Sequence, residues 1–199
     1  MGHTKGAQTR QAILEAAIGR FGREGYRATA VADIARDANV GGTVPYAYFP
    51  SKEALFLAAV DEDAAGVIHE GLSKVIDDLD VDDWRQTLIF TLVSAVERHP
   101  LARRLLAGLE PEVTERVLEI PALAELRKAC AERLHAEQLA GTVRHDIDPV
   151  VMANGIVAIV LSLLMSVVQL GPGAAAAYAG DVAAVFEAAL DRKPPTRGR

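Results

Sequence analysis

In residues 41–56, GGTVPYAYFPSKEALF, three of the chain's few aromatic side chains, Tyr46, Tyr48 and Phe49, fall within four positions shortly after two glycines. The hydroxyls of Tyr46 and Tyr48 can reach phosphate oxygens, as such side chains commonly do in DNA complexes. Glycine in turn permits a close approach of the backbone to a ligand. Two kinds of site therefore fit this stretch: a glycine loop that holds a nucleotide phosphate, or a short helix that binds DNA.

The nucleotide alternative finds little support elsewhere in the chain. The sequence lacks a GxxxxGK[ST] loop, and Gly19, Gly22 and Gly25 lie inside a helical pattern without a preceding strand. The five histidines have no spacing typical of metal ligands, and the sequence contains no recognisable pair of nucleophile and base. We therefore expect neither an enzyme, nor a metal site, nor a bound cofactor.

The single cysteine, Cys130, excludes a disulfide within the chain and is consistent with a reducing compartment. We expect it to be a small core residue, because no base for a reactive thiol can be identified. The first residues lack the apolar stretch of a secretory signal. The sequence thus predicts a cytoplasmic protein.

The charge of the chain is unevenly distributed. Residues 1–52 hold seven Lys and Arg against four acids, which gives a net charge of +3. Because the whole chain has a net charge of −6, residues 53–199 carry −9. This distribution favours an anionic binding partner for the basic residues 1–52. Chance clustering of solvated charges is the alternative.

Nearly every segment shows apolar residues at helical spacing, and none shows a sustained alternation of two residues. Breaks occur at glycine and proline, as at His99-Pro100 and Asp148-Pro149. We predict an all-α fold of about nine to ten helices. The expected ranges are Thr9–Gly25, 30–38, 42–48, a long helix capped by Ser51, then 82–98, 100–109, 112–119, 121–140, 148–170 and 174–191.

The second and third of these helices form a candidate helix-turn-helix. Thr29 is a suitable N-cap for the second helix, and Asn39 can adopt the left-handed conformation that a tight turn requires. Ile34 and Pro45 are apolar where two crossing helices bury their inner faces, and Ala35 is small where they approach closest. We expect Phe49 in the core below them.

At these residues the sequence resembles the DNA-binding head of the tetracycline-repressor (TetR) family. The family pattern is roughly Thr-x-x-x-Asp-Ile-Ala, a Gly-Val turn, and Tyr-x-Tyr-Phe-x-Ser-Lys-Glu. The matching residues are Thr29, Asp33, Ile34, Ala35, Val40, Tyr46, Tyr48, Phe49, Ser51, Lys52 and Glu53. The resemblance implies that the second motif helix enters the major groove, and that Thr29, Tyr46, Tyr48 and Lys52 hold phosphates.

The sequence departs from that pattern at Asn39, Gly41 and Pro45, which replace a glycine, a serine and a leucine. Residues 41–48 also contain no Arg, Lys, Asn or Gln, the side chains that make most bidentate contacts to bases. Thr43, the methyls of Val44 and Ala47, and the backbone at Gly42 remain for base readout. We expect Arg36 and an N-terminal arm with Lys5 and Arg10 to supply the missing donors.

Residues 150–170 contain 16 apolar residues among 21. A membrane span is one interpretation, since about 20 apolar residues cross a bilayer. A helix that is apolar almost all round can instead be covered by its own domain on one side and by a second copy on the other. The TetR resemblance likewise implies dimerisation through the last two helices. The predicted interface comprises Ala158, Ser162, Ser166, Gln169, Ala183 and Ala184.

The same resemblance implies a small-molecule effector in the larger, C-terminal part of the chain. Apolar side chains of the middle helices are candidates for its pocket, and a packed core is the alternative for each. The predicted pocket residues are Trp84, Phe90, Leu105, Leu109, Cys130 and Met152.

We accordingly predict a DNA-binding head at residues 1–52, an effector-binding and dimerisation domain at 53–192, and a disordered tail at 193–199. The predicted partners are double-stranded operator DNA, a second copy of the chain and a small molecule, without a membrane. The predicted function is a ligand-responsive repressor. The alternatives are an activator, or a membrane-associated helical adaptor anchored by residues 150–170.

Overall fold

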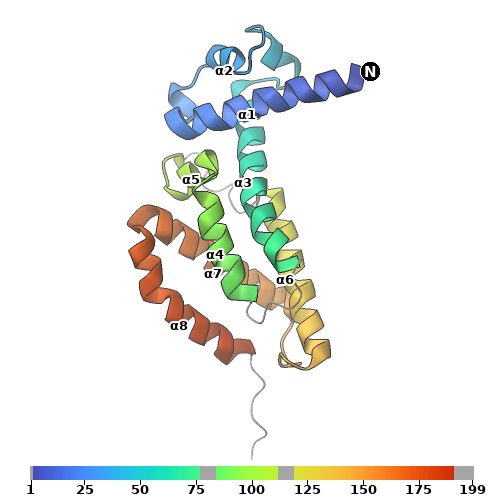
Figure 1. Cartoon of the computed structure of the whole chain (residues 1–199), viewed down its shortest axis with the longest axis vertical. Helices are drawn as coiled ribbons and strands as arrows, with labels where there is room; N and C mark the ends of the chain where they lie inside the picture. The colour runs from blue at the N-terminus through green and yellow to red at the C-terminus, as the bar shows by residue number, and fades with distance from the viewer. Residues whose placement is uncertain (1, 77–83, 112–118, 191–199) are drawn as a thin grey trace, which may run out of the picture. The chain divides into compact units, whose positions relative to one another are not determined.

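The computed structural model describes residues 2–76, 84–111 and 119–190 of the chain (Figure 1). Within these ranges it contains eight α-helices and the 3-10 helix η1, without a strand. The predicted all-α fold is thus confirmed, with slightly fewer helices than expected. The chain divides into two compact units: unit 1 comprises residues 1–70 and 94–122, and unit 2 comprises 71–93 and 123–199. These units follow packing, and the functional boundary at residue 52 stays a prediction.

Helix α1 (Gly2–Ala28) is longer than the sequence predicted. It begins at Gly2, so the residues expected to form an arm before Thr9 are helical. Its apolar residues recur at helical spacing, and Ile13, Leu14 and Phe21 among them are fully buried. The helix is interrupted near its end at Gly25, whose φ of 84° favours glycine over other residues.

The candidate helix-turn-helix consists of α2 (Val31–Asp37) and η1 (Val44–Ala47). Ile34 and Ala35 are fully buried, as their spacing predicted. Asn39 has a φ of 54°, which confirms the left-handed turn.

Two local predictions in this motif were wrong. Thr29 does not cap α2: Ala30 occupies the cap position, and the Thr29 hydroxyl donates to the carbonyl of Gly25 at 2.8 Å. The helix expected at 42–48 is instead a four-residue 3-10 helix. Gly41 and Gly42 disfavour a helix start before Pro45, which lies in the first turn, where a missing N–H is tolerated.

The remaining helices begin at or near the predicted residues. Ser51 caps α3 (Lys52–Ile76) as expected, because its Oγ accepts from the N–H of Ala54 at 3.0 Å. The others are α4 (Trp84–Val96), α5 (Pro100–Leu106), α6 (Pro121–Ala140), α7 (Pro149–Leu170) and α8 (Pro172–Leu190). Four of these five begin with proline, which is tolerated at the first helical position. The helix predicted at 112–119 falls largely outside the described residues.

Unit 2 buries one face of α4, where Trp84, Leu88 and Leu92 recur at helical spacing. Helices α7 and α8 pack against each other and are joined at Gly171, whose φ is 89°. The Asp148 carboxylate caps α7 by accepting from the N–H of Val150 at 2.8 Å.

Candidate nucleic-acid interface

A cluster of aromatic rings supports the helix-turn-helix from below. Phe21 and Phe56 meet edge to face with ring centroids 4.9 Å apart, and Tyr26 lies at the same centroid distance from Phe56. Phe49 is buried, as predicted. Such pairs fix the mutual orientation of α1 and α3 and contribute beyond the apolar area that they bury. The motif therefore rests on a rigid base.

Above this base, η1 and the turn before it present their side chains to solvent. Gly42, Thr43 and Ala47 are exposed, and Tyr46 is 53% exposed although it is large and aromatic. Val44 is half-buried. No atom lies within 4 Å of a Cβ built at Gly42, so the backbone here is accessible. The surface is polar-poor and open, as the sequence indicated.

The first turns of α1 flank this surface. The Tyr48 hydroxyl is the nearest atom to a Cβ built at Gly6, at 3.9 Å, and Tyr48 itself is half-buried. The Arg10 guanidinium lies 5.0 Å from the centroid of the Phe49 ring, where a cation–π contact holds it. Lys5 is exposed on the same helix. Both cations thus lie on helix α1, so the part of the predicted N-terminal arm that holds Lys5 is helical.

Two predicted phosphate-binding residues already have partners within the chain. Thr29 is buried, and its hydroxyl is bonded to Gly25 as described above. The Lys52 ammonium lies 4.5 Å from the Tyr26 ring centroid and donates to the carbonyl of Arg27 at 3.4 Å. Lys52 is half-buried at the first turn of α3, where the helix N-terminus also favours anions. Their roles toward phosphate stay predictions.

The arginines of the head differ in how firmly they are held. Arg20 makes a bidentate contact to Asp37 at 2.7 and 2.9 Å and also reaches Glu24 at 2.8 Å. This hydrogen bonding lowers the pKa of Asp37, so the pair links α1 to α2. The Arg36 side chain is 71% exposed and contacts only Asp33, one turn earlier, among the interactions found in the described residues. Arg36 is therefore the more available cation for an external partner.

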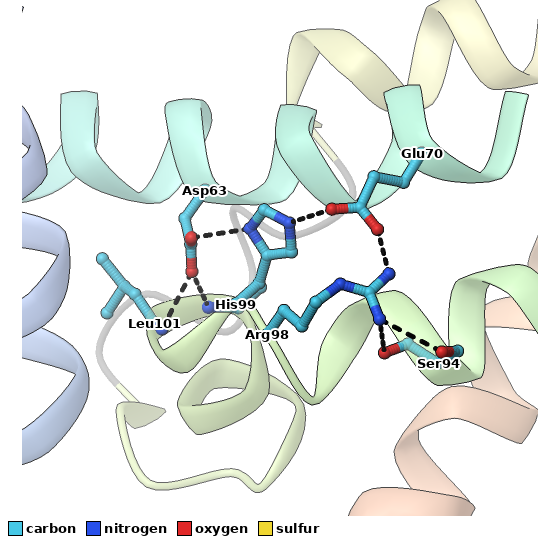
Figure 2. A network of polar contacts seen from close by, with 7 residues as sticks. Asp63, Glu70, Ser94, Arg98, His99 and Leu101 are labelled. Atoms are coloured by element: carbon cyan, nitrogen blue, oxygen red, sulfur yellow. Dashed lines mark hydrogen bonds and ion pairs between the residues drawn. The ribbon is translucent and has the colours of Figure 1, made fainter. Parts of the chain in front are cut away.

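Helix α5 is fixed to α3 by a polar network (Figure 2). The buried Asp63 carboxylate accepts from the N–H groups of Leu101 and Ala102 at 2.9 and 2.8 Å and lies 2.8 Å from Nδ1 of His99. These contacts satisfy donors at the start of α5 that have no partner within the helix. The other His99 nitrogen, Nε2, lies 3.2 Å from Glu70.

Glu70 extends this network to Arg98, whose guanidinium also donates to the carbonyl and hydroxyl of Ser94 at 3.1 and 3.2 Å. The contact with Arg98, and secondarily that with His99, lowers the pKa of Glu70. Both ring nitrogens of His99 thus face a carboxylate, that of Asp63 on one side and that of Glu70 on the other.

The other side of α5 packs directly on α1 (Figure 1). A Cβ at Gly22 would lie 2.7 Å from Cβ of Pro100, so a side chain at this position would force the helices apart. Beside it, the Glu110 carboxylate accepts from the N–H of Tyr26 at 3.1 Å and from Nε of Arg104 at 2.7 Å. The contacts of Gly22 with Pro100 and of Tyr26 with Glu110 join residues far apart in the chain, so sequence patterns did not reveal them.

The predicted pocket residues fall in both units. Trp84, Leu105 and Cys130 are buried, Met152 is half-buried, and Phe90 and Leu109 are 63% and 56% exposed. Burial raises the pKa of the Cys130 thiol to about 12, as expected for an inert core cysteine. The assignment of these six residues to a pocket stays a prediction.

The predicted dimer residues lie on the outer faces of α7 and α8. Ala158, Ser162, Gln169, Ala183 and Ala184 are exposed, and Ser166 is half-buried. The hydroxyls of Ser162 and Ser166 donate to carbonyls one turn earlier in α7, both at 2.9 Å, and so need no external acceptor. The exposure leaves this face accessible to a partner; the interface itself stays a prediction.

Residues 13–59 match the family model of bacterial regulatory proteins of the tetR family. The chain is 32% identical over 155 residues to the A-factor receptor protein of Streptomyces griseus. This match covers 77% of this chain and 53% of that protein. It is 41% identical over 49 residues to the HTH-type transcriptional regulator YuxN of Bacillus subtilis, covering 25% and 17%. The chain thus spans about half the length of one curated relative and a smaller part of the other.

Among solved structures, the fold is similar to that of Thermus thermophilus FadR, described as a TetR-family transcriptional repressor in complex with lauroyl-CoA. The TM-score is 0.65 at 23% identity, and the match covers 96% of this chain and all of the other. At this identity the likeness concerns the fold alone. It extends over both units, whereas the family model covers the head.

Proposed function

Because the chain belongs to the TetR family of bacterial regulatory proteins, we propose that it is a repressor released from operator DNA by a small molecule. The observation that carries this proposal is the surface around η1. A rigid aromatic base presents exposed Thr43 and Tyr46, and Lys5, Arg10 and Arg36 are accessible cations of the same head. Phosphate contacts from such groups position a protein on DNA, and base contacts specify the site.

We propose that the DNA-bound form is a homodimer joined through α7 and α8. Only 33% of the most apolar window of α7 is buried within the single chain, so much of this helix requires a further cover. A second copy supplies it, and a near-palindromic operator would then offer one half-site to each head. Two heads about 34–36 Å apart reach successive major grooves on one face of the DNA.

The membrane alternative rests on the same helix. Among the described helices, α7 is long and apolar enough to cross a bilayer, a test that core helices of soluble proteins also pass. The family assignment favours a partner helix over lipid. Purification without detergent as a dimer would support the proposal, and a requirement for detergent would support an anchor.

The effector is proposed by analogy with two relatives. One is a receptor for A-factor by name, and the other is a repressor described with lauroyl-CoA bound. An effector shifts the balance between DNA-bound and released forms only by its difference in affinity for the two. Activation in place of repression would use the same head and the same effector site, and would change only the position of the operator relative to the promoter.

Selection of genomic DNA fragments by the purified protein tests this proposal. We expect enrichment of one near-palindromic sequence, bound about 10³-fold or more tightly than random duplex at a fixed salt concentration. Reporter expression from a promoter carrying that sequence should rise when the gene for the regulator is deleted. Recovery of fragments without a shared sequence would contradict the proposal, and a fall in expression would favour the activator.

A further inference from the structure

We propose that Glu110 is a positioning residue for DNA binding. It lies outside the helix-turn-helix, after the end of α5, and holds the point at which the chain leaves α1 for α2. The inference rests on the proposed function and adds a residue that the matched family region, residues 13–59, does not include. All residues that carry it belong to unit 1.

Helix α1 is broken close to its end. Gly25 has a φ of 84° and a ψ of 169°, values outside the helical region. A helix that is interrupted in this way loses part of its ladder of hydrogen bonds, so the backbone groups beside the break need other partners. These partners decide how firmly the break keeps its shape.

Side chains satisfy backbone groups on both sides of the break. The Tyr26 N–H donates to Oε1 of Glu110 at 3.1 Å, and the Gly25 carbonyl accepts from the Thr29 hydroxyl at 2.8 Å. Thr29 is buried and directly precedes Ala30, the N-cap residue of α2. A continuous path of hydrogen bonds and peptide units therefore leads from Glu110 through the break to the start of α2.

Glu110 itself is held in place. It is only 8% exposed, and its Oε1 also accepts from Nε of Arg104, at 2.7 Å. A Cβ built at Gly25 would lie 2.7 Å from the same oxygen, so the carboxylate lies directly against the backbone at the break. A buried carboxylate requires a counter-charge and hydrogen bonds, and the Arg104 guanidinium and the Tyr26 amide supply them. The Tyr26 N–H thus has an acceptor whose position is set before DNA binds.

This arrangement matters for sequence preference. Base contacts depend on close placement of the motif, whereas the attraction of cations to phosphates depends on it much less. Without Glu110, the Tyr26 N–H would lose its acceptor, and the break would no longer be held in one conformation. The head should stay folded, because its aromatic cluster and the ion pair of Arg20 with Asp37 remain. Such a protein should lose preference for the operator and keep most of its affinity for random DNA.

Two substitutions of Glu110 separate the acceptor from the charge. Glu110→Gln keeps an oxygen for the Tyr26 N–H, whereas Glu110→Ala removes it. The DNA probes are the operator recovered by the selection described above and a random duplex of equal length. We expect Glu110→Ala to reduce the ratio of operator to random-DNA affinity about tenfold, and Glu110→Gln to keep it within about threefold of the wild type.

Glu97→Ala is the matched control for this measurement. Glu97 is an exposed acid of the same unit and lies 3.5 Å from Arg103 in an exposed ion pair. Such pairs contribute little, so the variant should bind both duplexes as the wild type does. If Glu110→Ala does not fold, Glu110→Asp takes its place, because the shorter side chain keeps a charge for Arg104 and withdraws the oxygen from Tyr26.

Amide hydrogen exchange of the full-length protein without DNA reports on the break itself. Residues 22–33 should exchange faster in Glu110→Ala than in the wild type, and at the wild-type rate in Glu110→Gln. The exchange of α3 should be the same in all three proteins. Faster exchange throughout the head, α3 included, would show a general loss of stability in place of a positioning role and would overturn the inference.

An unchanged affinity ratio in Glu110→Ala, or in Glu110→Asp where that variant replaces it, would also overturn the inference, as would an equal loss in Glu110→Gln. The wild type separates these results from a failure of the proposed function. A wild-type protein that prefers no DNA sequence would refute the regulator. A wild type that selects an operator, together with an undiminished ratio in Glu110→Ala, would refute the role of Glu110 alone.

Discussion

Two surfaces of the molecule are built from small residues, and they differ in what covers them. Where α1 meets α5, a Cβ at Gly22 would lie 2.7 Å from Cβ of Pro100 and 2.9 Å from its carbonyl carbon. On the outer face of α7, no atom lies within 4 Å of a Cβ at Gly155, and the neighbouring Ala158 and Ser162 are exposed. The first surface is complete within the chain, whereas the second is open.

This difference indicates which surfaces of the molecule are accessible to a partner molecule. Glycine allows two helices to approach closely only where a second backbone is present. At α1 and α5 that backbone belongs to the same unit, and hydrogen bonds from backbone N–H groups to the carboxylates of Asp63 and Glu110 secure it. Among the residues that the structure describes, the open face of α7 at Gly155 and the open backbone at Gly42 lack such a neighbour. We propose that a second copy of the chain covers the former and that DNA contacts the latter.

The largest effect is expected from Ser162→Arg. If a second copy covers α7, the new guanidinium would be buried without a counter-charge, which costs several kcal/mol. Sedimentation should show the wild type at about twice 21.2 kDa and the variant as a folded monomer. His135→Arg, at an exposed position on α6, should stay dimeric. A dimeric Ser162→Arg would refute the predicted interface.

Gly22→Ala should destabilise the protein by about 1–3 kcal/mol, because Pro100 and its backbone cannot yield without separating α5 from α1. Gly19→Ala is the control in the same helix. Its new methyl meets only the flexible end of Arg23 at 3.2 Å, and alanine favours the helix by up to about 1 kcal/mol. Urea unfolding measures both variants. Equal stability of the two would show that the α1–α5 contact is looser than described.

A smaller effect concerns base readout at the open surface of the head. The exposed Arg36 can make a bidentate contact to a base, whereas Thr43 can donate a single hydrogen bond. Arg36→Ala should therefore reduce the ratio of operator to random-DNA affinity by about 1–3 kcal/mol, and Thr43→Ala by less. Competition binding at one salt concentration measures the ratio. A larger loss for Thr43→Ala would mean that η1 reads the bases alone.

The smallest effect is expected from Lys52→Ala. A phosphate contact carries no sequence information, so affinity for operator and for random DNA should fall together, and the salt dependence should lose about one unit of slope. Titrations over a range of salt concentrations measure this slope. An unchanged slope would indicate that Lys52 remains bound to Tyr26 and Arg27 in the complex.

Sequence patterns predicted the helices well because their apolar spacing and proline breaks are local signals. Asn39 and Ser51 behaved as expected. The helix at 42–48 failed because two glycines and a proline left too few residues with helical preference. Thr29 failed as a cap because the φ of Gly25 brings a carbonyl within reach of its hydroxyl.

The contacts that position the candidate site were less accessible to prediction. Asp63 and the N-terminus of α5 are 38 residues apart in the chain, and Tyr26 and Glu110 are 84 apart. Periodic sequence patterns do not reveal contacts between such distant residues. In the sequence alone, Asp63 and Glu110 look like any other polar residue.

Native mass spectrometry of the protein with its selected operator, alongside a random duplex of equal length, tests the central claim most directly. If DNA and a second copy complete the two open surfaces, the complex should contain one duplex and two chains of 21.2 kDa, and should form on the operator at concentrations where random DNA stays free. Ser162→Arg should abolish this species. A single chain bound per operator, or equal occupancy of both duplexes, would contradict the account.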